Sequence, residues 1–597
     1  AERNYADHGG GTRSMAPFGY GNGGGGPTRE MMERYRRMRD LEGLPTLDIE
    51  SPAEFFAKAA ADYPNAPRWV GELYFEMHRG TYTSQAKMEA GNRRCEILLG
   101  EVELWSTIAH RLGLLVYPAE VLRAAWREVL TLQFHDIIPG SSIAWVHDDA
   151  ETTHARWEEV LTIARDEALA VLSVAIGGDV TLANSAPDDR AEVVMVHAPD
   201  TVVAAPAQRL ADGRIALWAD IPAMGVAGVE WSALHEAPAP CAVEQRAGDI
   251  VMSNHLVRVT IDGDGLIASV YDLRADREVV KRGHRANMLE LSADHPIEYD
   301  AWDLDEYYAN STVDLTDATS IEIVDRGPLL TSTRVVRSFG RSRIEQLLVL
   351  RAGSARIDIV NDVSWHEDEK VLKVAMPVDV HAESATCEIQ FGSVSRPTHA
   401  STSWDAAKFE VCAHRWVDVS EHGYGVALLN DSKYGHDLHR GALRLTLLRA
   451  SNFPDPDADR GDHHFTYSLF PHLGDHVEGA VVAEAARLNQ PIVALAAAGE
   501  RMEPAAPWSV ASTSNRSVVV TAVKFAEDGS GDVIVRCYEA SGGRANADLF
   551  LGFDVEAVKV CDLLERALDD EVDAASIDGD AIRMRLRPFQ ILTLRVR

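Results

Sequence analysis

Long apolar runs are missing from this sequence of 597 residues. No run approaches the roughly 20 apolar residues needed to cross a bilayer, so we expect no membrane span and no membrane partner. Residues 1–5 lack a basic stretch followed by an apolar core, and therefore do not form a secretory signal. An initiator methionine is also missing, which suggests that something precedes residue 1. The length predicts roughly three to five domains.

Cysteine is scarce, and its spacing excludes two classes of small domain. The six cysteines are scattered without a Cys-x-x-Cys pair: Cys95, Cys241, Cys387, Cys412, Cys537 and Cys561. This spacing supports neither a zinc ribbon nor a dense disulfide framework. It fits a reducing compartment, and we predict a cytoplasmic protein.

Positive charge is scarce too. The chain carries 58 lysines and arginines against 92 aspartates and glutamates, a net charge of -34. Nucleic-acid phosphates would be repelled by such a surface, so we expect no nucleic-acid partner. The balance suits an enzyme that acts on neutral ligands such as sugars. A homo-oligomer is compatible with the sequence.

Glycine, in contrast, is dense near the N-terminus, where Gly21-Asn22-Gly23-Gly24-Gly25-Gly26-Pro27-Thr28 stands. Such a stretch can be a flexible linker or a loop whose backbone approaches a ligand closely. We favour an active-site loop, because Thr28 begins a predicted helix. No Gly-Lys-Ser/Thr follows, which excludes a phosphate-binding loop.

Residues 1–76 alternate between helix and strand patterns. A charged helix is predicted over about 29–43 and a short strand over 45–49. Ser51, Pro52 and Glu54 form a helix-start signature, which predicts a helix as far as Asp62. An apolar strand is predicted over 70–76. This alternation is typical of the closing units of an α/β domain whose beginning is absent.

Three amphipathic helices are predicted next. Apolar residues recur at intervals of three and four over 98–112, over a stretch that starts after Pro118 and runs to His135, and over about 150–176. Short connections between them predict an antiparallel three-helix bundle. We interpret the apolar stripes as packing residues and assign them no catalytic or binding role.

Beyond Gly178 the pattern changes to short strands. They are separated by turns rich in Gly and Asp, and recur over 256–261, 332–350, 356–363, 424–430, 443–448, 518–525, 532–538 and 582–596. Regular short strands of this kind predict β-sandwich domains.

Two polar stretches stand at the edges of the predicted bundle. The first, residues 76–84 (EMHRGTYTS), lies between a strand and a helix, where sites often form, although a capped helix start is an equal alternative. In the second, His135-Asp136 precedes a Pro139-Gly140 break, which places the pair near a helix end. An imidazole and a carboxylate held there could share a metal and a substrate. A capping or surface role is the alternative.

Acidic and aromatic residues alternate in a third stretch, residues 300–308 (DAWDLDEYY). Aromatic faces stack on pyranose rings and carboxylates accept hydrogen bonds from hydroxyls, so this is the composition of a sugar-binding surface. Polar loops at 430–437 and 455–464 could act similarly or be solvated acidic loops. Metal binding by His463 and His464 is disfavoured, because adjacent strand side chains point to opposite faces.

Together these stretches resemble the glycoside hydrolase family 38 α-mannosidases, in their bacterial and cytosolic-type branch. The matching motifs run in the family's order: PFGYGNGGGGPTREM from Pro17, GELYFEMHRGTYTSQA from Gly71, QFHDIIPGSS from Gln133, the DAWD run from Asp300, YGVALLNDSKYGHD from Tyr424 and LLRASNFPDPDADRGDHHFTYSLFPH from Leu447.

The resemblance implies a multidomain α+β chain. Residues 1–76 would be the C-terminal remnant of a (β/α)7-type catalytic barrel, 77–177 a three-helix bundle, and 178–597 large β-sandwich domains. It also implies retaining hydrolysis of terminal α-linked mannose from oligosaccharides with a divalent metal, zinc or else cobalt. By the same resemblance His135 is a metal ligand and Asp136 a substrate contact. Tyr82 and Arg449 would lie near the sugar.

Two departures from the family pattern shape the hypotheses. The family's other metal ligands and its nucleophile lie in the first half of its barrel, which this chain does not contain by motif, so we expect residues 1–597 alone to be inactive or nearly so. Asn22 stands where the family's glycine loop has an Asp near the acid/base position, and an amide cannot exchange that proton. The alternative is a truncated or degenerate member that at most binds carbohydrate.

Overall fold

The computed structural model describes residues 5–6, 10–21, 25–198, 206–496, 505–568 and 574–597. The chain divides into two compact units, Ala1–Tyr74 and Phe75–Arg597. Each is described by itself below. Among the described helices, none has an apolar stretch long enough to cross a bilayer.

The first unit contains two helices, α1 (Arg29–Met38) and α2 (Pro52–Asp62). Thr28 caps α1, and its side chain accepts a hydrogen bond from the amide of Met31. Ser51 caps α2 through a reciprocal capping box with Glu54, and Pro52 takes the first helical position. The prediction for 51–62 is therefore confirmed, because its signals are local to the helix end.

The strands predicted in this unit are not formed. Residues 45–49 and 70–74 are irregular, and no strand is assigned among the described residues of Ala1–Tyr74. A strand needs a hydrogen-bonding neighbour on at least one edge, and an apolar run without one has no ladder to join. The expected barrel remnant at 1–76 is thus not observed as a sheet; residues 76–78 form the short 3₁₀ helix η2 (Glu76–His78).

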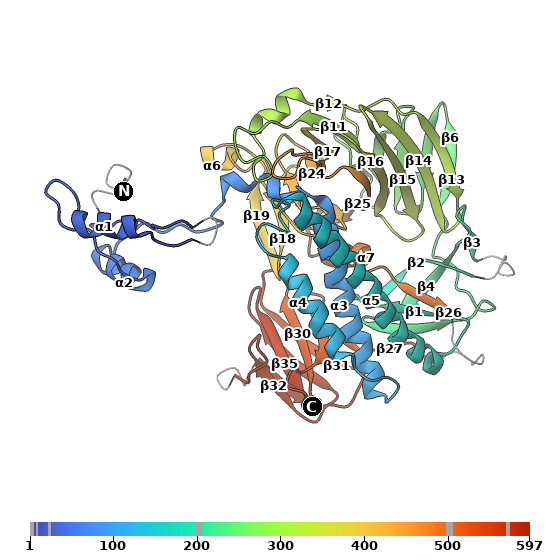
Figure 1. The fold of residues 1–597 in the computed structure, drawn as a ribbon. Coiled ribbons are helices and arrows are strands. Elements are labelled where there is room, and N and C mark those ends of the chain that lie inside the picture. The colour runs from blue at the N-terminus through green and yellow to red at the C-terminus, as the bar shows by residue number, and fades with distance from the viewer. Residues whose placement is uncertain (1–4, 7–9, 22–24, 199–205, 497–504, 569–573) are drawn as a thin grey trace. The chain divides into compact units, whose positions relative to one another are not determined.

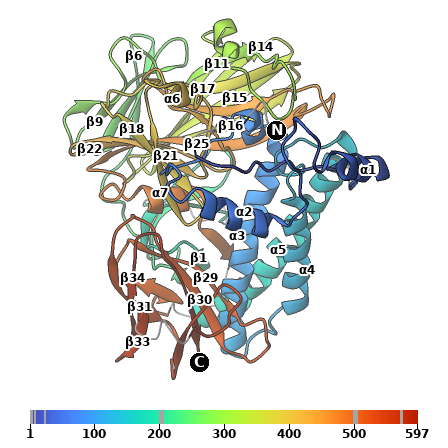
Figure 2. The ribbon, with the colours of Figure 1, turned by 90° about the vertical axis from the view of Figure 1, so that its left-hand side faces the viewer.

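Three helices open the second unit after η3 (Gly80–Tyr82): α3 (Ala86–Arg111), α4 (Ala119–Leu132) and α5 (Ala144–Ile176). Figures 1 and 2 both show them side by side. They share one core, which includes the buried residues Cys95, Leu99, Val102, Leu122, Val129 and Leu161. The predicted stripes correspond to these helices, although α3 and α5 begin earlier than expected, at Ala86 and Ala144.

The rest of the unit consists mostly of strands, and the three largest sheets are built from strands between residues 242 and 473. The nine-stranded sheet has the order β13 (Ser320–Arg326), β14 (Leu330–Phe339), β15 (Ser342–Arg351), β16 (Ile357–Trp365), β25 (Gly461–Leu473), β22 (Tyr424–Asn430), β21 (Trp416–Glu421), β18 (Ser384–Ile389) and β19 (Gly392–Pro397). The six-stranded sheet has the order β12 (Val313–Asp314), β11 (Met288–Ala293), β17 (Lys370–Met376), β24 (Leu443–Arg449), β23 (Gly435–Asp437) and β20 (Val411–Cys412). The five-stranded sheet has the order β10 (Arg277–Glu278), β9 (Ile267–Asp272), β8 (Val257–Ile261), β7 (Asp249–Ser253) and β6 (Ala242–Arg246).

Four smaller sheets complete the unit. Two of them share a core. The four-stranded sheet has the order β26 (Val493–Ala496), β1 (Val180–Asn184), β5 (Gly225–Val229) and β27 (Trp508–Ser509). The three-stranded sheet has the order β2 (Arg190–Val196), β4 (Ile215–Ile221) and β3 (Gln208–Arg209). The C-terminal pair has the orders β28 (Ala511–Thr513), β31 (Ala545–Leu551), β34 (Ala581–Leu586), β33 (Ala575–Asp578) and β29 (Val518–Phe525), β30 (Val533–Glu539), β35 (Ile591–Val596), β32 (Val558–Cys561). Short helices that interrupt the strands in the described part of the unit include η4 (Glu306–Ser311), α6 (Ser403–Ala406) and α7 (Val481–Asn489).

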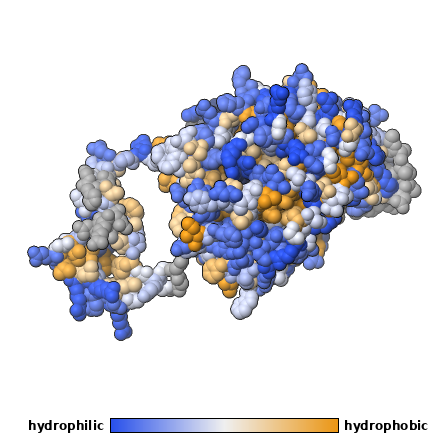
Figure 3. All heavy atoms as spheres, turned by 90° about the horizontal axis from the view of Figure 1, so that it is seen from above, coloured by the Kyte–Doolittle hydropathy of each residue, from blue (hydrophilic) through white to orange (hydrophobic). Residues whose placement is uncertain are grey.

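Apolar cores join these sheets to the helices. The C-terminal pair of sheets packs on α3 and α5 through one cluster that contains Trp105, Ile108, Leu169, Val520 and Leu594. A buried hydrogen bond links the nine-stranded sheet to the six-stranded sheet. The hydroxyl of Tyr467, on β25, donates to Oδ1 of Asn287, the residue before β11, at 2.6 Å. On the face seen in Figure 3 the surface is mostly hydrophilic, with smaller hydrophobic patches. The prediction of a chain dominated by short strands after the helices is confirmed.

Candidate functional site

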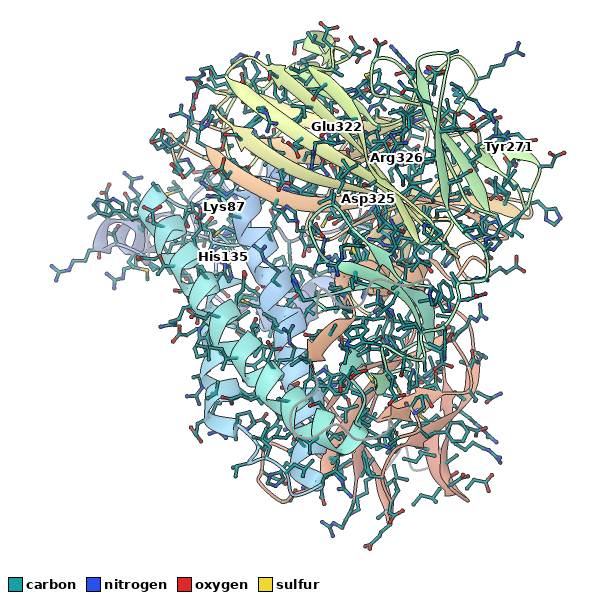
Figure 4. The ribbon with its side chains drawn as sticks, turned by 90° about the vertical axis from the view of Figure 1, so that its right-hand side faces the viewer. Lys87, His135, Tyr271, Glu322, Asp325 and Arg326 are labelled. Atoms are coloured by element: carbon teal, nitrogen blue, oxygen red, sulfur yellow. The ribbon has the colours of Figure 1, made fainter. Side chains whose placement is uncertain are left out.

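The His135-Asp136 pair lies in a turn that follows α4. The helix ends at Leu132, so the turn carries the pair beyond the last helical residue. Asp136 accepts a hydrogen bond from the Ser141 hydroxyl at 3.0 Å, whereas the side chain of His135 is 78% exposed. Its ring packs against that of Phe134, with the centroids 4.2 Å apart. Figure 4 shows where His135 lies. The imidazole is therefore available to a ligand.

Gly140 fixes this turn against the segment that contains Tyr82. Its φ of +71° lies in the left-handed region, which glycine adopts without strain. A Cβ added at Gly140 would lie 2.0 Å from the carbonyl oxygen of Ser84 and 2.9 Å from the Cβ of Gln85. The backbone of the His-Asp turn thus touches the backbone of residues 84–85. Two motifs that stand at opposite ends of the α3–α4 pair in the sequence meet here.

Arg449 joins a third motif to the same place. Its side chain is 1% exposed and forms an ion pair with Asp294. Its five N–H groups donate to Asp294 Oδ2 (2.6 Å), Ser84 Oγ (3.0 Å) and the backbone oxygens of Asp300 (2.6 Å), Ala301 (3.1 Å) and Asp303 (2.5 Å). A guanidinium has five donors, so none is left for a substrate. The resemblance implied a position near the sugar; the geometry instead makes Arg449 part of the framework.

The run at 300–308 is also framework for the most part. The Asp300 carboxylate accepts hydrogen bonds from the amides of Asn452 (2.5 Å) and Phe453 (2.9 Å). Leu304 and Tyr308 are buried together in a small apolar cluster. Asp303 and Asp305 accept hydrogen bonds from the nearby amides of Leu304 and Tyr307. Most of this run therefore does not form the expected sugar-binding surface, because three of its carboxylates are bonded to backbone amides. Tyr307, 65% exposed, is its main accessible aromatic side chain.

A buried ionic cluster lies behind the start of α3, and sequence reasoning missed it. Asp459 accepts a hydrogen bond from the amide of Ala86 at 2.8 Å, and burial raises its pKa to about 7. Burial also raises the pKa of Glu89 well above its usual value and lowers that of Lys433. The signals were polar residues in the motifs at 430–437 and 455–464, but their convergence on α3 is a tertiary event. With a pKa of about 7, the buried carboxyl of Asp459 changes its protonation state near neutral pH.

The structure therefore brings some of the predicted site residues together, and gives others a supporting role. His135 and Asp136 share one turn, and Tyr82 lies partly buried in η3, within the Gly80–Ser84 segment that Gly140 and Arg449 contact. Arg449 supports this assembly from inside. Asn22 lies outside the described residues.

A catalytic zinc does not fit the described residues alone. Such a metal normally needs about three protein ligands. Among the residues that the structure describes, no group of three or more His, Cys, Asp or Glu side chains is placed to hold a metal ion. His135 and Asp136 contribute at most two ligands, with Nε2 and Oδ2 3.9 Å apart. We derive no step of a reaction through a metal.

Comparison with known families identifies four stretches. Residues 1–72 match the glycosyl hydrolases family 38 N-terminal domain, and 76–172 match the alpha mannosidase middle domain. Residues 252–457 match the family 38 C-terminal domain, and 517–594 match its C-terminal beta sandwich domain. The expectation that the N-terminal half of the barrel is lacking is not borne out, since the N-terminal domain is among the matches.

Similar proteins match along almost the whole chain. Alpha-mannosidase 2C1 of Homo sapiens is 36% identical, over 99% of this chain and 56% of its own length. Alpha-mannosidase G of Dictyostelium discoideum is 32% identical, over 98% of this chain and 58% of its own. The chain thus spans about half the length of these relatives. A crystal structure of an alpha-mannosidase from Enterococcus faecalis has the same fold, with a TM-score of 0.76 and 16% identity, covering 96% of this chain and 74% of that one.

Proposed function

We propose that this chain, which belongs to glycosyl hydrolase family 38, is part of an α-mannosidase. The proposed enzyme hydrolyses terminal α-linked mannose in oligosaccharides with retention of configuration. The support for the activity is the relatives' printed names together with identities of 36% and 32% over nearly all of this chain. Retention requires two carboxyl groups, one as nucleophile and one as acid then base, about 5–5.5 Å apart.

The observation that carries the proposal is the meeting of separate motifs at one place. The turn at 135–142, the segment at 80–85 and the run at 300–303 are joined by Gly140, Ser84 and Arg449. Ser84 donates its hydroxyl to the backbone oxygen of Ala301 at 2.8 Å, which ties the last two together. Segments that function independently have no reason to be locked together in this way.

Within this assembly we assign roles to three residues. The Asp136 carboxylate, held by Ser141, would accept hydrogen bonds from hydroxyls of the mannose ring. Tyr82 would contact the same sugar. His135 would be one ligand of a divalent cation, zinc or cobalt, with its further ligands supplied from outside the described residues. The partner of this site is a mannose-containing oligosaccharide, and the compartment that we propose is the cytoplasm.

The test is hydrolysis of 4-nitrophenyl α-mannoside by the natural full-length protein, with zinc, with cobalt and after chelation. We expect metal-dependent release of nitrophenol by the wild-type protein. His135→Ala should lose this activity, and mass spectrometry should show that it has also lost one equivalent of bound metal. Lys408→Ala, a substitution elsewhere in the same unit, is the control. A folded protein that hydrolyses another α-glycoside but no mannoside would overturn the substrate class. Residues 1–597 alone should show little turnover, and clear metal-dependent turnover contradicts that expectation.

A non-catalytic, carbohydrate-binding role is the second candidate. The incomplete ligand set around His135 in the described residues favours it. It predicts that the full-length protein binds mannosides in calorimetry but releases no nitrophenol with any divalent metal.

A further inference from the structure

A groove of about 700 Å³ runs along α3 and reaches the His135 turn at one end, where Gln133 and Ile138 line it but His135 and Asp136 do not. Its floor extends from Asn92 to Leu104, which spans about 18 Å at the helical rise of 1.5 Å per residue. One wall is α4, and the other is formed by α7, β29 and the turn between β18 and β19. Figure 2 shows α3 between the C-terminal strands on one side and α5 and α4 on the other. The volume lies within the range that is typical of small-molecule binding pockets.

One end of the groove is polar and its side chains are fixed by each other. Gln133 donates its amide N–H groups to Asn92 Oδ1 and Glu96 Oε1, both at 2.9 Å. Glu96 is exposed to solvent in the groove, although the surrounding protein raises its pKa. A carboxylate has about four acceptor positions, so Glu96 retains capacity to accept hydrogen bonds from a ligand.

Arg93 stands at the inner side of this polar end. It is 5% exposed, and it donates to Tyr434 Oη at 3.0 Å and Asn489 Oδ1 at 2.7 Å. Its Nη2 is buried without a hydrogen-bond partner among the described residues. Buried polar groups are usually paired, so an unpaired guanidinium nitrogen beside a groove points to a missing oxygen partner.

Each acid that lines the groove has a cationic partner. Arg93 offsets Glu96, and Arg415 pairs with Glu388 through its side chain and its amide, the latter at 2.7 Å. Glu101 pairs with Arg165, just outside the lining, at 3.2 Å. His414 is neutral near pH 7, because burial lowers its pKa to about 4. A groove without net charge gives no preference to anions or cations. It suits a neutral ligand that can both donate and accept hydrogen bonds.

An aromatic side chain is presented to the same groove from a strained turn. Phe391 occupies the two-residue turn between β18 and β19 with φ +55°, where glycine or asparagine is favoured. Its side chain lines the groove and is 39% exposed, with its ring edge-to-face against Tyr538 at 5.6 Å. The turn chemistry alone would not select phenylalanine. Strained backbone of this kind concentrates at functional sites.

We propose that this groove is a second binding site, which holds a neutral carbohydrate chain with its hydroxyls on Glu96 and on the unpaired Nη2 of Arg93, and with a sugar ring on Phe391. A sugar hydroxyl donates to a carboxylate and accepts from an N–H group, so one ligand satisfies both kinds of partner. Ring faces of sugars pack on aromatic side chains, which accounts for the exposed phenylalanine. The inference goes beyond the proposed hydrolysis, because it concerns binding alone.

Calorimetry with S-linked α-mannotriose, which glycosidases do not cleave, and with maltotriose tests this site. We expect one of the two to bind, with at least about tenfold weaker affinity in Phe391→Asn and a smaller loss in Glu96→Gln. Phe391→Asn should keep or raise the midpoint of thermal unfolding, because it relieves the positive φ. This separates a lost contact from a lost fold. Phe550→Asn, at an equally exposed phenylalanine on β31, should leave affinity unchanged.

Three results would overturn the proposal. The first is no binding of either trisaccharide at millimolar concentration by the folded protein. The second is unchanged affinity in Phe391→Asn. The third is loss of the bound trisaccharide in His135→Ala, which would place the ligand at the other site. Failure of mannoside hydrolysis does not bear on these outcomes, so the two proposals fail separately.

Discussion

Arg449 and His135 stand on motifs of the same family resemblance, yet the structure uses them in opposite ways. Arg449 is 1% exposed and all five of its donors have protein acceptors, while His135 is 78% exposed and makes one ring contact. A motif therefore shows that a residue matters without showing how. Burial and the number of occupied donors separate a framework residue from one that is available to a ligand. Substitutions at each site can test this contrast.

The largest effect is expected from Arg449→Met. It leaves Asp294 buried without its cation, and removing one partner of a buried pair costs about 3–5 kcal/mol of unfolding free energy. Urea unfolding followed by circular dichroism measures the loss. The control is Arg123→Met, which removes an exposed arginine from the exposed Glu120 and should cost about 1 kcal/mol or less. Equal losses in the two variants would contradict the framework role of Arg449.

Gly140→Ala should have the next largest effect. Its Cβ would meet the Ser84 carbonyl oxygen at 2.0 Å, so the turn at 135–142 must move away from residues 84–85. A loss of about 1–3 kcal/mol from overpacking adds to the strain of the positive φ. Gly113→Ala is the matched control, because Gly113 has φ +72° and nothing within 4 Å of an added Cβ. A difference near zero between the two variants would show that the contact is unimportant.

Asp459→Asn tests the buried cluster through pH. The pKa of Asp459 is about 7 in the folded state and about 3.9 when unfolded. Between pH 4 and 7 the folded state holds a proton that the unfolded state releases, so the unfolding free energy falls as pH rises, by at most about 1.4 kcal/mol per pH unit. Urea unfolding at pH 5, 6, 7 and 8 should show a flatter dependence in the variant. Asp457→Asn, at an exposed neighbour, should keep the wild-type slope.

The smallest effect on stability is expected from His135→Ala. An exposed side chain with one ring contact should change the unfolding free energy by no more than about 0.5 kcal/mol. The same variant is expected to abolish metal-dependent turnover in the full-length protein. Thermal unfolding and the mannoside assay together make the measurement. A large loss of stability would mean that His135 belongs to the framework after all.

Sequence reasoning succeeded where structure is set by near neighbours. Ser51 and Glu54 define the start of α2, because a capping box is closed within the first helical turn. The strand at Tyr424–Asn430 was predicted with its observed bounds, because its apolar run is flanked by turn residues. Local signals such as these account for most of the helices and strands.

It failed where a partner far along the chain decides the outcome. Residues 70–74 have the composition of a buried strand but no described strand to pair with. The role of Arg449 depends on Ser84, which is 365 residues away. The groove along α3 could not be predicted, because α3, the residues after α4 and the turn between β18 and β19 meet only in the folded chain. The turn at Phe391 has a bulky residue where glycine is favoured, but its positive φ is not visible in a sequence.

The four-stranded sheet that contains β1 sets an order of events during synthesis. The early strands β1 and β5 pair with each other, and their outer edges pair with β26 and β27, which are made only after all three large sheets. At roughly 5–20 residues per second, a ribosome needs on the order of tens of seconds to deliver those two strands. Until then the nascent chain exposes two unpaired strand edges that can pair with other chains. The growing polypeptide therefore depends on protection, by a chaperone or by low local concentration, before this sheet can close.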